Sequence, residues 1–313
     1  PISTAALSVC SRTVRRCSTS SRGQLIVPIL KVELHPFPWC PTMLTKIDVE
    51  EMCEFHLLLS EDPFEREHGI SYEREVNSCI GWLLGVLPLT HCRLKRFVID
   101  CGGADPILHN DVLKALLVCL KQYCRNLTEV CFCGPLQDLR LWSLDNASCD
   151  IFGRVFASLH KLRKLLLYID VYSEQGYVSI LKGITACKTL QSLALCVYGS
   201  PEMGHSAWAA LQQMLGMLSL QSVKLSGVIA LDLCAEIRWP PNLHTVAISL
   251  SVSEIPGDDD LCRFAKQICS SQVIILSIVW NRFAISASGF CTFLRILSKS
   301  QLKSLQLRIA QCI

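Results

Sequence analysis

The sequence lacks the long apolar run that a membrane-spanning helix requires. Such a helix takes about 20 consecutive apolar residues, whereas the longest conspicuous run here, residues 80–89, is shorter and contains glycine and proline. Charged residues are scarce as well, at 18% of the chain, and the net charge is only +3. Aromatic residues make up 7% and are not interleaved with basic ones, as they are in stacking surfaces for nucleic acids. We therefore expect neither a membrane nor a nucleic acid as a partner.

Patterns that bind a metal are missing too. The sequence contains no Cys-x-x-Cys pair and no two histidines four residues apart, which are the spacings of common zinc sites. The nearest candidate is the pair Cys131 and Cys133 on one expected strand, which we interpret as two thiols of that strand rather than as zinc ligands. We expect no metal and no cofactor.

Cysteine itself is abundant, but its distribution does not fit a secreted disulfide framework. The 19 cysteines are odd in number and are scattered along a long chain, and a free thiol inside an element behaves as a small apolar residue. We expect a reducing compartment, the cytoplasm, with the nucleus as an alternative. Residues 1–32 are rich in arginine and serine and contain no acid, a composition that also suits a mitochondrial targeting segment.

What the sequence does contain is a repeated hexapeptide, Leu-x-x-Leu-x-Leu with conservative replacements. Its apolar and variable residues alternate over the last four positions, which predicts a strand. Successive copies start between 23 and 35 residues apart. The eight copies start at Leu94, Leu127, Leu162, Leu190, Leu220, Leu243, Val273 and Leu302.

The segments between these strands have helical periodicity. Apolar residues recur at i, i+3, i+4 and i+7, as at Leu113, Leu116, Leu117 and Leu120. Similar stripes begin at Phe152, Tyr177, Leu211, Leu261 and Phe290. Neither a strand nor a helix of this kind can bury its apolar face alone, so the pattern predicts an α/β solenoid of stacked units, with parallel strands inside and helices outside.

On these eight hexapeptides, residues 94–313 resemble the leucine-rich repeat family in its longer strand-plus-helix form. The resemblance implies a solenoid with parallel strands on the concave face and helices on the convex face. The Asn or Cys typical of the ninth position of each unit is present only as Asn281, so we expect a divergent solenoid with irregular turns. The shortest unit contains Trp239-Pro240-Pro241, where proline disfavours helix, and we expect its helix to be short or missing.

The chain is expected to divide into three segments. Residues 1–50 form an N-terminal segment with little order, and residues 51–93 form a degenerate first repeat or cap with a strand over 54–59, an acidic loop over 61–67 and a following helix. Residues 94–313 form the solenoid. Because the sequence ends just after the last strand, where stacked repeats need a cover, we also expect it to be a fragment of a longer protein.

The resemblance implies that the concave face binds a partner through the variable positions of the strands. Arg and Tyr are typical anchors of protein interfaces. That these side chains are solvated and have no partner stays open as an alternative. The candidate contacts are Arg96, Asp100, Glu129, Lys164, Tyr168, Lys224 and Arg308.

The repeats are similar to those of F-box-type ubiquitin-ligase receptors, in which the solenoid holds a substrate. They are also similar to the C-terminal sensing regions of nucleotide-binding innate immune receptors. The resemblance therefore implies a non-enzymatic module that binds a protein rather than a small-molecule substrate, as a ubiquitin-ligase adaptor or, alternatively, as a ligand- or partner-sensing region.

One string has an enzymatic appearance. Gly204-His205-Ser206-Ala207-Trp208 resembles the Gly-x-Ser-x-Gly turn of serine hydrolases, but a tryptophan replaces the second glycine. A helix N-terminus with Ser206 as its cap explains the string without chemistry. A serine hydrolase that uses Ser206 is kept as a minor alternative.

Overall fold

The computed structural model describes residues 18–19, 25–26, 29–34, 47–48, 52–59, 80–90, 93–100, 110–133, 143–171, 173–198, 204–227, 236–237, 239–250, 257–280 and 285–309. The expected acidic loop over 61–67 and the turn residue Asn281 lie outside these ranges.

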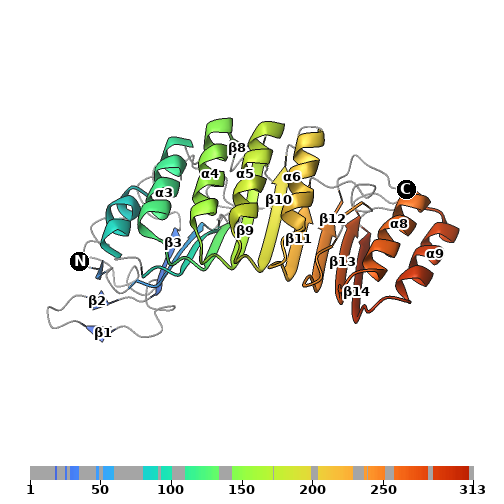
Figure 1. Ribbon diagram of the computed structural model, residues 1–313. Coiled ribbons are helices and arrows are strands. Elements are labelled where there is room, and N and C mark those ends of the chain that lie inside the picture. Colours follow the sequence, from blue (N-terminus) through green and yellow to red (C-terminus); the bar gives the residue numbers. More distant parts are fainter. Residues whose placement is uncertain are drawn as a thin grey trace, which may run out of the picture.

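A single open sheet of parallel strands runs the length of the described molecule (Figure 1). Strands that follow one another in the chain are neighbours in the sheet, and the short strand β8 (Ser143–Leu144) pairs with the end of β9. The eight hexapeptides supply the strands from β6 to β14 except β8, so the predicted α/β solenoid is confirmed. The sheet contains β3 (Ile29–Leu34), β5 (Glu54–Leu59), β6 (Arg96–Asp100), β7 (Glu129–Cys133), β9 (Lys164–Val171), β10 (Ser192–Tyr198), β11 (Ser222–Ser226), β12 (Thr245–Ser249), β13 (Ile275–Trp280) and β14 (Ser304–Ile309).

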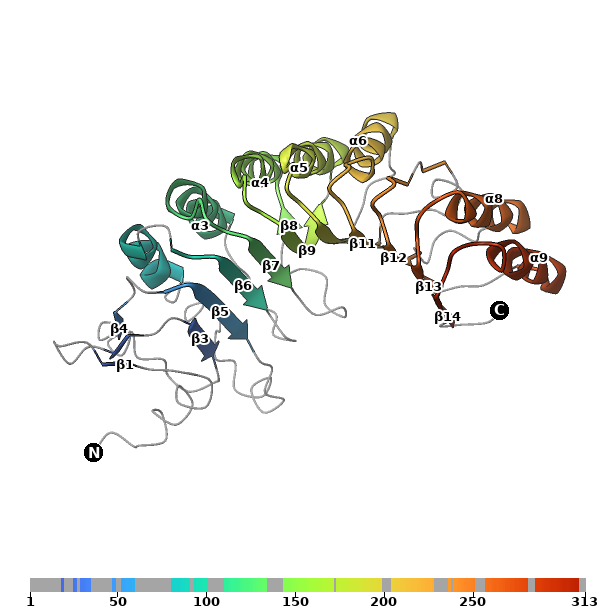
Figure 2. The ribbon, with the colours of Figure 1, turned by 60° about the horizontal axis from the view of Figure 1, so that its bottom comes forward.

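The sheet curves, and the helices lie on its outer side (Figure 2). The predicted apolar stripes face the sheet, so that Leu113, Leu116 and Leu120 of α3 (Asn110–Tyr123) are fully buried. On α9 the stripe is only partly buried, because Leu294 keeps 37% of its surface exposed. The described helices are the one over 80–86, the 3-10 turn η3 (Leu87–Thr90), α3 (Asn110–Tyr123), α4 (Asn146–Ser158), α5 (Glu174–Ala186), α6 (His205–Leu215), α8 (Asp258–Cys269) and α9 (Ala287–Leu297). None of these helices has the length and hydropathy needed to cross a membrane.

The strand register places similar apolar residues next to one another in the layer between the sheet and the helices. Leu165 of β9 pairs with Leu193 of β10, and Leu167 pairs with Leu195, all of them buried. Towards the N-terminal end the same layer is aromatic: the rings of Phe97 and Phe132 lie 5.9 Å apart. One continuous apolar layer therefore joins all the described repeats, and each buried side chain of this size contributes about 1.5 to 3 kcal/mol.

Two pairs of successive helices, α5 with α6 and α8 with α9, are connected at their N-termini by acidic side chains. Glu174 of α5 accepts a hydrogen bond of 3.0 Å from the backbone amide of Ala207 in α6. In the same way Asp258 of α8 accepts a hydrogen bond of 3.0 Å from the amide of Ser286, the N-cap of α9. The expected cap of α6 is wrong: Ser206 is exposed as the second residue of the helix, and the N-cap is Gly204, which has no side chain to make a cap bond. The carboxylate of the preceding repeat takes that role.

The short unit around Trp239 is irregular where it is described. Residues 239–244 contain a turn and no helix or strand, and the indole of Trp239 is buried. Asn242 donates a hydrogen bond of 2.7 Å to the carbonyl of Leu218, at the end of the preceding unit. Residues 228–235, where a short helix would lie, are outside the described ranges, so the missing helix stays a prediction.

The sheet continues before the first hexapeptide. Strand β5 was expected, whereas β3 comes from the segment for which little order was predicted; it pairs with β5 in parallel over its whole length. Phe55 and Leu57 of β5 and Ile80 and Leu83 of the following helix belong to the continuous core. The division at residues 50 and 93 itself stays a prediction. A separate small sheet consists of β1 (Ser18–Thr19), β2 (Leu25–Ile26) and β4 (Ile47–Asp48).

Candidate binding face of the sheet

The concave face of the sheet is the side that the described helices leave uncovered (Figure 2). Because side chains alternate along a strand, every second residue points to this face, and the register aligns these residues in rows across the strands. The structure places all seven predicted contact residues in these rows. Arg96, Glu129 and Lys164 lie in the first row, Lys224 in the second, and Asp100, Tyr168 and Arg308 in the third.

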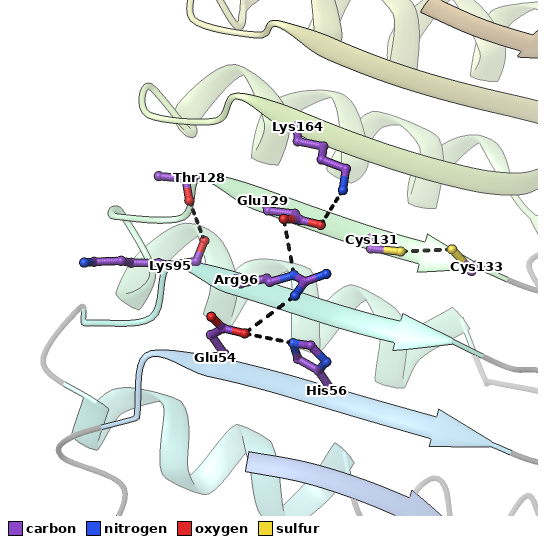
Figure 3. Close-up of polar contacts among 9 residues, drawn as sticks. All are labelled: Glu54, His56, Lys95, Arg96, Thr128, Glu129, Cys131, Cys133 and Lys164. Carbon is purple, nitrogen blue, oxygen red and sulfur yellow. Dashed lines mark hydrogen bonds and ion pairs between the residues drawn. The ribbon is translucent and has the colours of Figure 1, made fainter. Parts of the chain in front are cut away.

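Charges alternate in sign along the first row (Figure 3). A guanidinium nitrogen of Arg96 lies 3.6 Å from the carboxylate of Glu54, and its Nε lies 3.2 Å from that of Glu129, an ion pair without hydrogen-bond geometry. Lys164 donates a hydrogen bond of 2.9 Å to Glu129. We call Glu54, Arg96, Glu129 and Lys164 the charge ladder. Its side chains are 20% to 47% exposed, so each pair contributes only about 0.2 to 1 kcal/mol.

The ladder begins one strand earlier than the sequence predicts. Glu54 and His56 lie on β5, outside the eight hexapeptides, and the Nε2 of His56 is 3.2 Å from the Glu54 carboxylate. Burial lowers the pKa of His56, and the nearby guanidinium of Arg96 lowers it further. The available signal was a weaker copy of the hexapeptide, Met52-x-x-Phe55-x-Leu57. Its apolar residues are buried, and Glu54 and His56 occupy its variable positions.

A second group of polar side chains lies in the centre of the face. The ammonium of Lys224 on β11 donates a hydrogen bond of 3.3 Å to the hydroxyl of Tyr168 on β9 and lies 5.9 Å from the centre of its ring. It therefore crosses β10, where the buried thiol of Cys196 lies. Tyr168 is half-buried and Lys224 is exposed. An aromatic ring and a cation are therefore accessible side by side, a combination typical of interface anchors.

Beside this group, two thiols lie on β7. The sulfur atoms of Cys131 and Cys133 are 2.9 Å apart (Figure 3). The contact to Cys131 raises the pKa of Cys133 strongly, and burial raises it further. The described residues contain no group of three or more His, Cys, Asp or Glu that could hold a metal ion.

From β10 onwards the face is different. Apart from Lys224 and Arg308, its rows consist mostly of small uncharged side chains. Arg308 lies on β14, three strands beyond β11, so the structure does not bring it together with the other six predicted residues. The small side chains are Ser192, Ala194, Ser222, Ser226, Thr245, Ala247, Ser249, Ser277 and Ser304.

Ser206 lies away from this face. It is in the first turn of α6, on the outer layer, and is exposed to solvent next to His205. A hydrolase nucleophile sits on a sharp bend between a strand and a helix, whereas Ser206 lies within the helix.

Comparisons with known proteins give a structural match alone. No family model and no curated protein matches the sequence. Among solved structures, the chain is similar to one in the crystal structure of a TLR13-ssRNA13 complex, with a TM-score of 0.42 and 14% sequence identity. The match covers 85% of this chain and 34% of that chain, so this chain spans about a third of its length. The solenoid assignment rests on the strand register and helix positions described above.

Proposed function

We propose that this chain is a non-enzymatic binding module that holds a protein partner against the concave face of its sheet. The observation that carries the proposal is the group of six predicted residues on neighbouring strands from β6 to β11, on the face that the described helices leave uncovered. The partly exposed charge ladder and the Tyr168–Lys224 pair supply charge, hydrogen-bond donors and an aromatic ring within one continuous area.

The balance of charge favours a protein over a nucleic acid. Binding to a phosphate backbone depends on an excess of basic groups. On β5 to β11 the face instead carries the acids Glu54, Asp100, Glu129 and the buried Asp170 against the bases Arg96, Lys164 and Lys224. A surface of mixed sign is typical of the polar part of a protein interface. We infer that acidic side chains of the partner meet Lys164 and Lys224, next to Tyr168.

Replacement of Lys164 by Glu tests this proposal. The variant places a second carboxylate next to Glu129 and reverses the charge offered to the partner, so capture of the partner should fall at least about tenfold, as for a contact worth more than 1.4 kcal/mol. The matched control is Lys182→Glu on the outer helix α5, which is exposed and far from this face. Both variants are first checked for an unchanged thermal midpoint. Equal capture by Lys164→Glu and the wild type would exclude the concave face as the binding surface.

The two proposed roles of the chain, ubiquitin-ligase adaptor or sensing region, are based on the family resemblance. As a ubiquitin-ligase adaptor, the chain should co-purify with cullin and adaptor subunits from cells; purification without them would favour the alternative of a sensing region. Described cysteines such as Cys149, Cys187 and Cys262 are free thiols, which supports a reducing compartment such as the cytoplasm.

A fluorophosphonate probe tests the non-enzymatic part of the proposal. Such probes react with activated serine hydroxyls. Ser206 should remain unlabelled, because its exposed position in the first turn of α6 provides no strained bend to present it. Labelling that disappears in Ser206→Ala would establish hydrolase chemistry instead.

A further inference from the structure

The concave face contains two thiols in contact with each other, and the proposed binding function does not explain this contact. Cys131 and Cys133 are two residues apart on β7, and Phe132 between them is fully buried on the opposite side of the sheet. The alternation of the strand therefore holds both thiols on the same face. Their sulfur atoms, 2.9 Å apart, are in direct contact.

Neither a metal site nor ordinary packing accounts well for this contact. A structural zinc ion needs four ligands, and the described residues offer no third or fourth ligand for one. Packed thiols would each fill an apolar space, as the buried Cys124 and Cys187 do. Cys133 is instead half-buried at the edge of the patch that contains Asp100, Tyr168 and Lys224, so a small solute can reach it.

We propose that Cys131 and Cys133 form a redox-active dithiol on the concave face, which a peroxide oxidises to an intrastrand disulfide and a dithiol reductant restores. This modification site is independent of the proposed partner binding.

The chemistry balances in two steps. The sulfur of Cys133, the more accessible thiol, attacks the peroxide; an S–O bond forms, the O–O bond breaks and one water leaves, which gives a sulfenic acid. The sulfur of Cys131 then attacks that of Cys133; the S–S bond forms, the S–O bond breaks and a second water leaves. The two thiols lose two electrons and two protons, and the peroxide is reduced to two waters.

The strand makes this disulfide easy to reduce again. Two residues along a strand cover about 6.6 to 6.8 Å between Cα atoms, whereas Cα atoms joined by a disulfide are about 4.4 to 6.8 Å apart. The bond would therefore form at the upper limit of the allowed separation, and strained disulfides are the labile ones. Since the thiolate is the reactive form and the pKa of Cys133 is raised, oxidation should be slow at neutral pH and faster at alkaline pH.

Peptide mapping of the intact chain tests the proposal. The reduced protein is treated with hydrogen peroxide at neutral and at alkaline pH, its remaining thiols are alkylated before digestion, and trypsin releases residues 126–140, which contain these two cysteines alone. We expect this peptide to be lighter by two hydrogen atoms and to carry no alkyl group. Its oxidised form should appear faster at alkaline pH and should return to the dithiol with dithiothreitol.

Three variants make the result specific. Cys131→Ser and Cys133→Ser should each abolish the oxidised peptide, whereas Cys196→Ser, which removes the third sulfur of the face but lies on β10, should leave it unchanged. If the wild-type peptide keeps two alkylatable thiols while peroxide modifies other cysteines, or carries separate oxidation products on the two sulfurs, the proposal is wrong.

A trivalent arsenical gives an independent measurement. Phenylarsine oxide bridges two neighbouring thiols by two As–S bonds, and its oxygen leaves as water. One arsenic per peptide 126–140 is expected in the folded wild type and none in either single serine variant. Absence of arsenic from the wild-type peptide would overturn the proposal, because it would show that the two thiols do not meet in solution.

Discussion

Single side chains on the concave face have contacts that cross the strands. Glu129 lies between Arg96 and Lys164, and the ammonium of Lys224 reaches over one strand to Tyr168. Each of these interactions is weak at such exposure, but together they hold long side chains in defined positions. A side chain ordered in this way loses less conformational entropy when a partner binds. Under the proposed function, the charge ladder therefore contributes more to binding than to the stability of the fold.

His56 makes the stability of the N-terminal repeats depend on pH. Burial and Arg96 lower its pKa, although Glu54 and Glu129 partly oppose this. Below its ordinary pKa of about 6.5, the unfolded chain therefore takes up a proton that the folded chain does not. The free energy of unfolding should fall as the pH decreases through that value, and less so in His56→Gln. Urea titrations of both proteins at several pH values measure this; an equal pH dependence in the two would contradict the assignment.

At the scale of elements, the helices α4 and α5 meet at two glycines. A Cβ atom at Gly183 would lie 2.2 Å from the carbonyl oxygen of Gly153, and one at Gly153 would lie 2.4 Å from that of Ser179. Backbone atoms of one helix therefore occupy the space that a side chain of the other would need. The close approach of the two helices depends on having no side chain at either position.

Gly183→Ala should separate these helices and destabilise the protein. The added methyl group meets backbone, which cannot move aside cheaply, so we expect a loss of about 2 to 3 kcal/mol in the free energy of unfolding. Gly85→Ala is the matched control, because a Cβ there has no neighbour within 4 Å. That change removes a helical glycine and should stabilise by up to about 1 kcal/mol. Similar effects of the two substitutions would exclude the contact as a determinant of helix packing.

The capping carboxylates also act between elements. Glu174 accepts the amide hydrogen of Ala207, so Glu174→Gln keeps the shape but weakens an acceptor that lies at the positive end of α6. The loss should be about 0.5 to 1 kcal/mol and should be confined to α6. Hydrogen exchange of the first amides of α6 measures it. Glu236→Gln, at an exposed position outside the described helices, is the control that should change nothing there.

The repeats could be predicted from the sequence, but the contacts between them could not. Each hexapeptide contains its own apolar alternation, so the eight strands and their concave residues follow from local pattern. Glu174 and Ala207, or Gly153 and Gly183, are about 30 residues apart and meet only because the repeats stack in one register. Strand β3 lies outside the eight hexapeptides, and its place in the sheet comes from its pairing with β5. Pairing across repeats depends on geometry that a single unit does not encode.

At the scale of the whole molecule, the layout predicts that stability is local. Each repeat packs against its immediate neighbours, so a solenoid behaves as a row of units coupled in pairs. Phe132 contacts Phe97 and Phe152 near one end, with ring centres 5.9 and 5.6 Å apart. Towards the other end, the ring of Phe293 lies 6.2 Å from that of Trp280. Both phenylalanines are fully buried, which makes them a matched pair.

Phe132→Leu and Phe293→Leu should therefore weaken opposite ends of the molecule. Each substitution removes buried ring atoms and should cost about 1 to 2 kcal/mol. In native-state hydrogen exchange, Phe132→Leu should reduce protection most in β6, β7 and α4 and progressively less towards β13, whereas Phe293→Leu should affect α8, β13 and α9 most. Partner binding on β6 to β11 should then be reduced by the first substitution and hardly by the second. Equal loss of protection along all strands in both variants would mean that the described repeats unfold as one cooperative unit, and that binding and stability cannot be separated along the chain.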